Sequence, residues 1–177
     1  MRISNYLYEG LNSQMGSATL EEKSLKALFK AVIGRFLQMT TLYIPMTPLM
    51  RVKIQRIRGV CIGENVFLGT DVYLDLVHPD MITIEDNVAI SGRNTIITHS
   101  CPPYHFKENH PRVGSIFSKV SPVTIKKGAW ITVGVVILPG VTIGENAIVT
   151  AGSVVTKNIP ANCIAQGNPA EVVYELK

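Results

Sequence analysis

Aliphatic residues recur six positions apart along much of the chain. Ile62, Leu68 and Leu74 form a first run, and Ile84, Ile90 and Ile96 form a second. A longer third run keeps the same step: Ile125, Ile131, Ile137, Ile143, Val149 and Val155. A six-residue period fits neither an α-helix nor a hairpin meander, whereas a parallel β-helix alternates short strands with tight turns. The pattern therefore predicts a mainly β fold in which one aliphatic side chain per hexad points into a narrow coil.

Turn residues follow the aliphatic positions at a constant offset. Gly63-Glu64-Asn65 comes after Ile62, and Gly144-Glu145-Asn146 repeats the phrase after Ile143. Gly and Asn adopt positive φ angles more readily than other residues, as sharp corners require. We expect these phrases to form the corners of the coil.

The period is interrupted twice. A longer step between Leu74 and Ile84 indicates a small bulge near His78. Residues 99–122 lose the rhythm completely and contain four prolines and three of the four histidines. Long loops inside compact domains are usually functional, so we predict an excursion loop over about 99–122 that carries part of a site.

The first 58 residues have a different character. A capping box at Thr19–Glu22 predicts the start of an amphipathic helix that runs to about Thr40. We therefore divide the chain into an N-terminal helical or extended segment, 1–58, and a β-helix domain, 59–177, with a short C-terminal tail from about residue 168. The basic side chains of the first segment leave two interpretations open: a helix packed on the main domain, or peripheral contact with a membrane surface.

Composition excludes several classes of protein. The chain is 46% hydrophobic and 17% charged, against roughly 25% charged in ordinary domains, which excludes disorder. Three widely spaced cysteines exclude a disulfide scaffold and favour the cytoplasm. A net charge of +4 is too small to indicate nucleic-acid binding. The charge-free stretch 36–50 is shorter than the roughly 20 apolar residues of a membrane span and contains two prolines, and no signal peptide is apparent at the start.

Several phrases in the second half are more specific than the repeat. They are Trp130-Ile131, Leu138–Gly144, Ala151–Lys157 and Gly167–Ala170. With the repeat, they resemble the hexapeptide-repeat O-acetyltransferases, in particular the maltose/galactoside and capsule-type group, over roughly residues 59–173. The resemblance implies a left-handed parallel β-helix, a homotrimer, and acetyl-CoA bound in clefts between neighbouring subunits.

Acetyl transfer to a hydroxyl requires a base, and the ordinary pKa of histidine suits that task. His99 ends a repeat where the excursion loop leaves the coil, and by resemblance it matches the catalytic base of these enzymes. As an alternative, it is only a hydrogen-bonded residue at a corner. Asp71 and Asp75 lie one coil earlier and, with Asn94, are candidates for binding the acceptor. Asp75 either orients the imidazole or binds a sugar hydroxyl, although acidic residues also form turns at such corners.

The resemblance also implies a cofactor site. A backbone N–H two or three positions after Trp130, at Thr132 or Val133, is expected to stabilise the oxyanion. The expected cofactor-binding residues are Trp130, Thr132, Val133, Gly134, Ala151, Gly152, Thr156 and Lys157. The chain departs from the family at Thr132 and Val133, which are bulkier than usual. It departs again at Glu171, where relatives carry Arg or Lys. This removes an expected phosphate contact and leaves Lys157, Lys126, Lys127 and Lys177 as the alternatives.

Two other interpretations remain. His99, Cys101, His105 and His110 lie close together in the sequence, with His78 upstream, and resemble the zinc ligands of γ-class carbonic anhydrases. A non-catalytic β-helix scaffold is the third interpretation. The preferred hypothesis is an acetyl-CoA-dependent O-acetyltransferase that transfers acetyl directly to a sugar or polysaccharide precursor, without a metal, in the cytoplasm.

Overall fold

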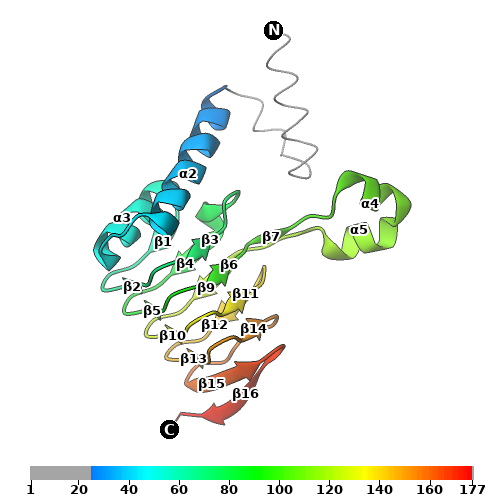
Figure 1. The fold of residues 1–177 in the computed structure, drawn as a ribbon. Coiled ribbons are helices and arrows are strands. Elements are labelled where there is room, and N and C mark those ends of the chain that lie inside the picture. Colours follow the sequence, from blue (N-terminus) through cyan, green and yellow to red (C-terminus); the bar gives the residue numbers. More distant parts are fainter. Residues whose placement is uncertain (1–24, 177) are drawn as a thin grey trace.

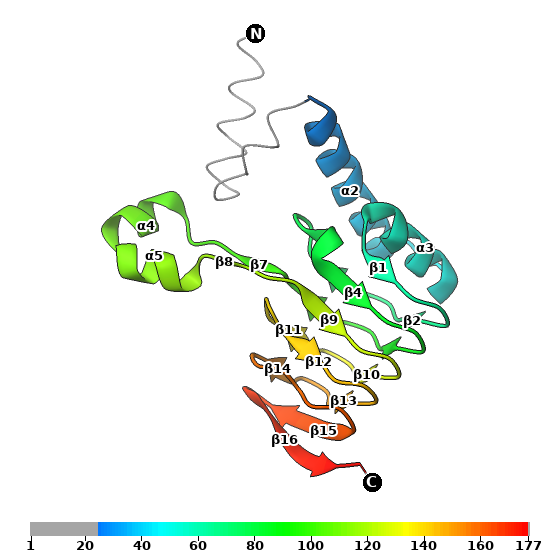
Figure 2. The ribbon, with the colours of Figure 1, turned by 180° about the vertical axis from the view of Figure 1, so that it is seen from behind.

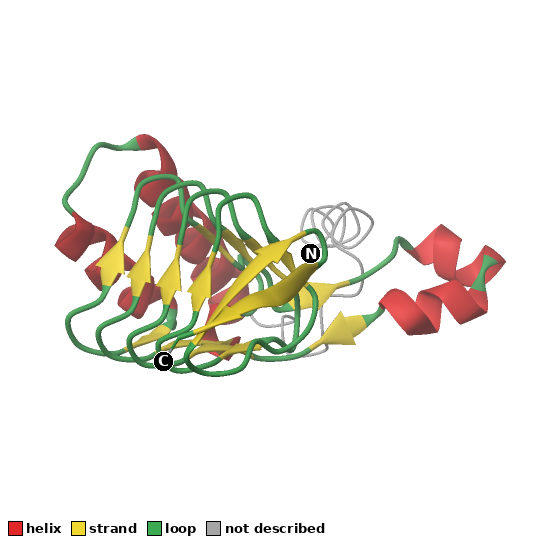
Figure 3. Cartoon of the chain, turned by 90° about the horizontal axis from the view of Figure 1, so that it is seen from below, coloured by secondary structure: helices red, strands yellow, loops and turns green. Residues whose placement is uncertain are grey.

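The computed structural model describes residues 25–176, so the predicted capping box at Thr19–Glu22 lies outside the described residues. A coil of short parallel strands forms the body of the molecule, with two helices at its N-terminal end and an arm that projects from its side (Figure 1). Viewed along the coil, the strands gather on separate sides with turns between them (Figure 3).

Three parallel sheets make up the sides of the coil. The first sheet contains β1 (Cys61–Ile62), β4 (Ile82–Ile84), β9 (Val123–Ile125) and β12 (Thr142–Ile143). The second contains β2 (Phe67–Leu68), β5 (Ala89–Ile90), β10 (Trp130–Ile131), β13 (Ile148–Val149), β15 (Cys163–Gly167) and β16 (Ala170–Glu175). The third contains β3 (Tyr73–Leu74), β6 (Thr95–Ile96), β11 (Val136–Ile137) and β14 (Val154–Val155). All pairs inside these sheets are parallel except β15 with β16, an antiparallel hairpin that closes the C-terminal end.

The predicted aliphatic positions fill the coil. In the third sheet, Leu74 pairs with Ile96, Ile96 with Ile137, and Ile137 with Val155, and all four side chains are fully buried. Burying one such side chain stabilises the fold by roughly 1.5–3 kcal/mol. Each coil therefore depends on the column of Ile, Leu and Val above and below it.

The predicted corner residues adopt the expected backbone. Asn65 and Asn146 have φ angles of 55°. At Gly144 the reason for glycine is space, because a Cβ there would lie 2.3 Å from the backbone nitrogen of Ala161 in the next coil.

Two helices, α2 (Leu25–Tyr43) and α3 (Pro48–Arg58), cover the N-terminal end of the coil (Figure 1). The first helix extends three residues beyond the predicted end at Thr40. The second begins with Pro48 after Thr47, whose Oγ1 accepts a hydrogen bond from the Met50 N–H at 3.3 Å. It ends at Gly59, which has a φ angle of 108° and donates to the carbonyl of Arg56.

The inner faces of these helices are polar because they meet the open edge of the first coil. Within residues 25–176, no strand covers the carbonyls of that edge, and unpaired backbone groups are costly when buried. Arg51 Nε donates to the carbonyl of Leu68 at 2.8 Å, and Gln38 Nε2 donates to that of Val72 at 3.1 Å. Arg56 reaches the carbonyl of Ile62 at 3.1 Å. Arg51 is buried rather than part of a basic surface, because it caps the edge.

Both predicted interruptions of the coil have a defined structure. The short 3-10 helix η2 (Pro79–Met81) occupies the bulge after His78. Residues 99–122, which we call the arm, leave the coil as an antiparallel pair, β7 (His99–Ser100) with β8 (Lys119–Val120). Two short helices, α4 (Tyr104–Asn109) and α5 (Pro111–Phe117), form its far end (Figure 2).

Candidate functional site

A buried carboxylate lies at the corner that follows the third sheet in the first coil. The side chain of Asp75 is fully buried, yet both of its oxygens have donors. Oδ1 accepts from the N–H groups of Val77 at 2.8 Å and His78 at 3.1 Å. Oδ2 accepts from the N–H of Thr98 at 2.8 Å and lies 2.7 Å from Nδ1 of His99.

These donors keep Asp75 ionised. Burial by itself would raise the pKa of the carboxyl group. The hydrogen bonds from Thr98, His78, His99 and Val77 outweigh that effect and lower the pKa to about 2. A negative charge is therefore held in place next to the imidazole at neutral pH.

The charge on Asp75 determines how His99 is protonated. An ionised carboxylate only accepts hydrogen bonds, so Nδ1 of His99 carries the proton toward it. The other ring nitrogen, Nε2, has no hydrogen-bond partner in the part of the chain that the structure describes. The side chain is 30% exposed and packs edge-on against the ring of His78, with centroids 5.7 Å apart. Nε2 is thus positioned to accept a proton from a bound molecule.

The coil register brings the two residues together. Leu74 and Ile96 pair directly in the third sheet, so the residues that follow them stack at the same corner. In the first coil the chain turns sharply at Val77 and His78 around the Asp75 carboxylate. In the next coil the chain passes through Thr98 and enters the arm at His99.

Sequence reasoning missed Arg58, which supports this corner from α3. Its guanidinium donates to the carbonyl of Asp75 at 2.7 Å and to that of Leu74 at 3.3 Å. The same group reaches the side chains of Gln38 and Gln55. Burial lowers the pKa of Arg58 to about 10, against the opposing effects of Tyr73 and Asp75. The only feature of the sequence that could have indicated this role is the position of Arg58, a charged residue directly before the first repeat.

The other two candidate acceptor residues lie elsewhere. Asp71 is exposed, with a φ angle of 56°, at the corner that precedes the third sheet. Asn94 lies at that same corner one coil later and is fully buried. Its Oδ1 accepts from the N–H of Val135 at 2.6 Å, and its Nδ2 donates to the carbonyl of Ser91 at 2.8 Å. The structure therefore groups Asp75, but neither Asp71 nor Asn94, with His99.

Five of the eight expected cofactor residues lie at the corner before the third sheet: Thr132, Val133, Gly134, Ala151 and Gly152. The N–H of Gly134 donates to Gly92 at 3.1 Å, and the N–H of Gly152 donates to Val133 at 3.0 Å. Gly134 and Gly152 adopt φ angles of 72° and 70°, and Ala151 precedes Gly152 on the surface.

The structure distinguishes the two candidate oxyanion donors. The N–H of Thr132 donates to the carbonyl of Val149 at 3.0 Å, so the coil already uses it. The N–H of Val133 has no partner within residues 25–176, and its side chain is 46% exposed. Val133 is therefore the candidate with an available donor.

The remaining cofactor candidates lie on other parts of the surface. Trp130 projects from β10 in the second sheet, is 48% exposed, and has Nε1 at 3.5 Å from Oγ of Ser91. Thr156 and Lys157 are exposed at the corner after β14, in the same column of corners as His99. The corner that contains Gly134 and Gly152 and the corner that contains Thr156 and Lys157 thus border opposite edges of the third sheet.

Of the residues proposed as zinc ligands, the side chain of His105 lies outside the described part of the structure. Among the described residues, no group of three or more His, Cys, Asp and Glu side chains is placed to hold a metal ion. Cys101 lies on the arm, with its Sγ 3.1 Å from Nζ of Lys107.

Comparison with known proteins bears on the fold. Residues 122–157 match the family model "Bacterial transferase hexapeptide (six repeats)". These residues thus carry the hexapeptide repeat of this transferase family. A galactoside O-acetyltransferase of Escherichia coli (strain K12) is 39% identical over 118 residues, which cover 64% of this chain and 56% of that protein. A putative acetyltransferase of Schizosaccharomyces pombe is 40% identical over 120 residues, 67% of this chain and 54% of that protein. The chain thus spans about half the length of these relatives.

Solved structures of hexapeptide-repeat proteins share the fold. A hexapeptide-repeat acetyltransferase from Vibrio cholerae has a TM-score of 0.68 at 24% identity, over 88% of this chain and 95% of that one. A galactoside acetyltransferase in complex with coenzyme A has a TM-score of 0.63 at 25% identity, over 94% and 90%. The predicted left-handed β-helix is confirmed. Within residues 25–176, no helix is both long and apolar enough to cross a membrane.

Proposed function

We propose that this hexapeptide-repeat protein is an acetyl-CoA-dependent O-acetyltransferase that acetylates a hydroxyl group of a sugar or a polysaccharide precursor. The observation that carries the proposal is the pair formed by buried, ionised Asp75 and Nδ1 of His99, 2.7 Å apart. Its relatives include galactoside O-acetyltransferases, and one structural neighbour is a complex with coenzyme A. These names support the reaction class but leave the acceptor of this chain to be found.

In the proposed reaction, Nε2 of His99 removes the proton of the acceptor hydroxyl as its oxygen attacks the acetyl carbon of the thioester. Collapse of the tetrahedral intermediate breaks the carbon–sulfur bond and releases the CoA thiolate, which takes the proton back from the imidazolium. Asp75 is the positioning residue: it holds the ring and stabilises its charged form. The N–H of Val133 is our candidate for the oxyanion donor. Because Val133 and His99 of one chain border opposite edges of the third sheet, the donor would come from a neighbouring subunit of the proposed homotrimer.

The proposed cofactor site must hold the CoA phosphates without the Arg or Lys expected at position 171. Glu171 is exposed on β16. Lys126 is already paired with Glu85 at 2.8 Å, whereas Lys157 and Lys127 are exposed, and Lys177 lies outside the described residues. We assign the phosphate contact to Lys157, because it lies in the same column of corners as His99. We also propose a cytoplasmic homotrimer, which the resemblance implies and which mass measurement in solution tests.

A thiol-release assay with acetyl-CoA over a panel of sugars and nucleotide sugars tests the function. We expect turnover with at least one acceptor, and His99→Ala should reduce it by about 10²–10⁴-fold. His110→Ala, an exposed histidine of the arm, is the matched control and should retain activity. Absence of turnover with every acceptor, together with absence of acetyl-CoA binding by calorimetry, would overturn the proposal. An acetyl thioester trapped on Cys101 without acceptor would instead overturn direct transfer.

A further inference from the structure

The helix α2 has its polar side toward the protein and its apolar side toward solvent. Gln38 and Thr41 are buried against the edge of the first coil, whereas Phe36 is 68% exposed and Tyr43 is 74% exposed. An ordinary surface helix has the opposite arrangement. The inner face is polar because the coil edge needs hydrogen-bond donors. As a result, none of the other described residues covers the apolar face.

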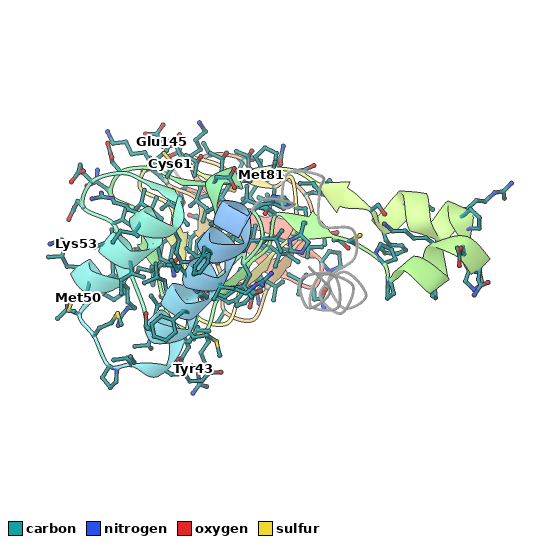
Figure 4. The ribbon with its side chains drawn as sticks, turned by 90° about the horizontal axis from the view of Figure 1, so that it is seen from above. Tyr43, Met50, Lys53, Cys61, Met81 and Glu145 are labelled. Carbon is teal, nitrogen blue, oxygen red and sulfur yellow. The ribbon has the colours of Figure 1, made fainter. Side chains whose placement is uncertain are left out.

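The uncovered side chains continue from α2 onto α3. On α2, Phe29, Ile33, Phe36 and Tyr43 recur at steps that put them on one side of the helix. We call the whole set the apolar cap, and each of its side chains is at least half exposed: Phe29, Val32, Ile33, Phe36, Met39, Tyr43, Ile44, Leu49, Met50 and Ile57. Seen from above, Tyr43, Met50 and Lys53 lie along the outer rim of the two helices, away from the coil (Figure 4). Apolar surfaces of this extent mark interaction sites.

The charges of this segment are of one sign. Residues 25–58 contain no Asp or Glu, and their basic residues are Lys26, Lys30, Arg35, Arg51, Lys53, Arg56 and Arg58. Lys53 is exposed between Met50 and Ile57 on α3. The neighbouring acidic residue Glu64 is paired with Arg56 at 3.2 Å. Apolar side chains together with lysine and without carboxylates are what an anionic lipid surface binds.

We infer that the apolar cap docks this protein on the surface of an anionic lipid bilayer, with α2 lying in the interface and not crossing it. Residues Phe29, Ile33 and Phe36 would enter the boundary between headgroups and acyl chains. Lys53 would contact the lipid phosphates from α3.

A second copy of the chain is the main competing occupant. The opposite end of the coil exposes Val172, Val173 and Tyr174 on β16, between Glu171 and Glu175. That end is apolar and acidic, so its charge is opposite to that of the basic segment that carries the apolar cap. However, a contact between opposite ends of two copies does not close and extends into a fibre. A bilayer would bury the same apolar side chains without producing a fibre, so the observations favour a bilayer. Residues 1–24 are the third occupant to test.

Co-sedimentation of the full chain with vesicles tests the inference. The vesicles are phosphatidylcholine containing about 30 mol% phosphatidylglycerol, compared with phosphatidylcholine alone. We expect binding to the anionic vesicles, reduced about tenfold by Phe36→Asp and about fivefold by Lys53→Glu. Val173→Asp and Lys127→Glu make the same changes at exposed positions away from the apolar cap, and should bind like the unchanged protein. Thermal melting of each variant identifies any loss of fold, in which case Ile33→Ser replaces Phe36→Asp.

Fluorescence gives a second, independent readout. The chain has a single tryptophan, Trp130, which lies on the second sheet away from the apolar cap. Its emission should not change with vesicles, whereas Phe36→Trp should add an emission that shifts to the blue on anionic vesicles.

Three outcomes would overturn the inference. If the full chain fails to bind anionic vesicles, and Phe36→Asp does not alter that result, residues 1–24 or another part of the protein cover the face. If Phe36→Asp and Val173→Asp both lower the mass in solution and leave vesicle binding unchanged, the apolar cap is an interface between copies. Equal binding by Phe36→Asp and the unchanged protein would place the lipid contact elsewhere.

Discussion

The carboxylate of Asp75 and the imidazole of His99 lie 2.7 Å apart, although 24 residues separate them along the chain. Adjacent coils of the third sheet bring them to one corner, and three backbone N–H groups hold the carboxylate in its ionised form. The relationship is rigid because the coil itself sets the spacing. It fixes the ring of His99, our proposed general base, where the arm leaves the coil.

Replacing Asp75 by Asn should reduce kcat by about 10²-fold or more, with a smaller change in the KM for acetyl-CoA. An amide does not hold the imidazole with its proton on Nδ1 as a carboxylate does, and it does not stabilise the imidazolium. The thiol-release assay measures this. Asp80→Asn, at an exposed carboxylate in the neighbouring bulge, is the control. Equal loss in both variants would show that Asp75 has no special role.

The contribution of Asp75 to stability should depend on pH. Its pKa is lowered to about 2 in the folded protein from 3.8, so its stabilising effect is complete above about pH 4. As the pH falls from about 4 toward 2, the unfolded chain binds the proton first, and on the order of 2 kcal/mol is lost. Urea unfolding at several pH values measures the slope. Asp75→Asn should lack this part of the slope, and an identical slope in both proteins would contradict the prediction.

Replacing Arg58 by Met should destabilise the fold by about 3 kcal/mol, because buried carbonyls of the coil edge and the side-chain oxygen of Gln55 lose their donor, and Gln38 loses one of two. Lys53→Met, on the exposed side of the same helix, should change the free energy of unfolding by no more than about 0.5 kcal/mol. Chemical denaturation compares the two. Similar free energies of unfolding for the two variants would mean that the contacts of α3 with the edge of the first coil do not stabilise the fold.

Two glycine substitutions should have opposite effects. Gly144→Ala places a Cβ 2.3 Å from the backbone nitrogen of Ala161, so the coils must separate, at a cost of about 1–3 kcal/mol. At Gly34 in α2, a Cβ meets nothing within 4 Å, and alanine should stabilise the helix by up to about 1 kcal/mol. Thermal melting should show a lower Tm for the first variant and an unchanged or higher Tm for the second.

The proposed oxyanion donor can be removed without changing the side chain's apolar character. Val133→Pro deletes the N–H. Gly134, the next residue, has a φ angle of 72°, which matches the third residue of a type II turn, and proline is common at the second residue of such turns. We expect kcat to fall by about 10²–10³-fold, while Val133→Ala, which keeps the N–H, retains most of the activity. Full activity in the proline variant would assign the donor to another group.

The sequence determined the coil, because the inward aliphatic positions and the corner residues depend only on contacts that repeat at a constant step. For this reason the columns of Ile, Leu and Val, the corners at Asn65 and Asn146, and the interruptions near His78 and over 99–122 were all predictable. The candidate base His99 was identified by its place at the interruption, and by resemblance to the family. The sequence also singled out Asp75 over Asp71, but it left open whether Asp75 orients the imidazole, binds a sugar hydroxyl or only forms a turn.

Tertiary structure alone decided what those side chains contact. Whether a carboxylate at a corner faces solvent or the next coil depends on the turn that follows it and on which coil lies above it, so only the structure pairs Asp75 with His99. Arg58 and Gln38 were unpredictable for a similar reason: the open edge that they cap exists only once the first coil has formed. The same need for donors turns the polar side of α2 inward, and within residues 25–176 it leaves the apolar side exposed.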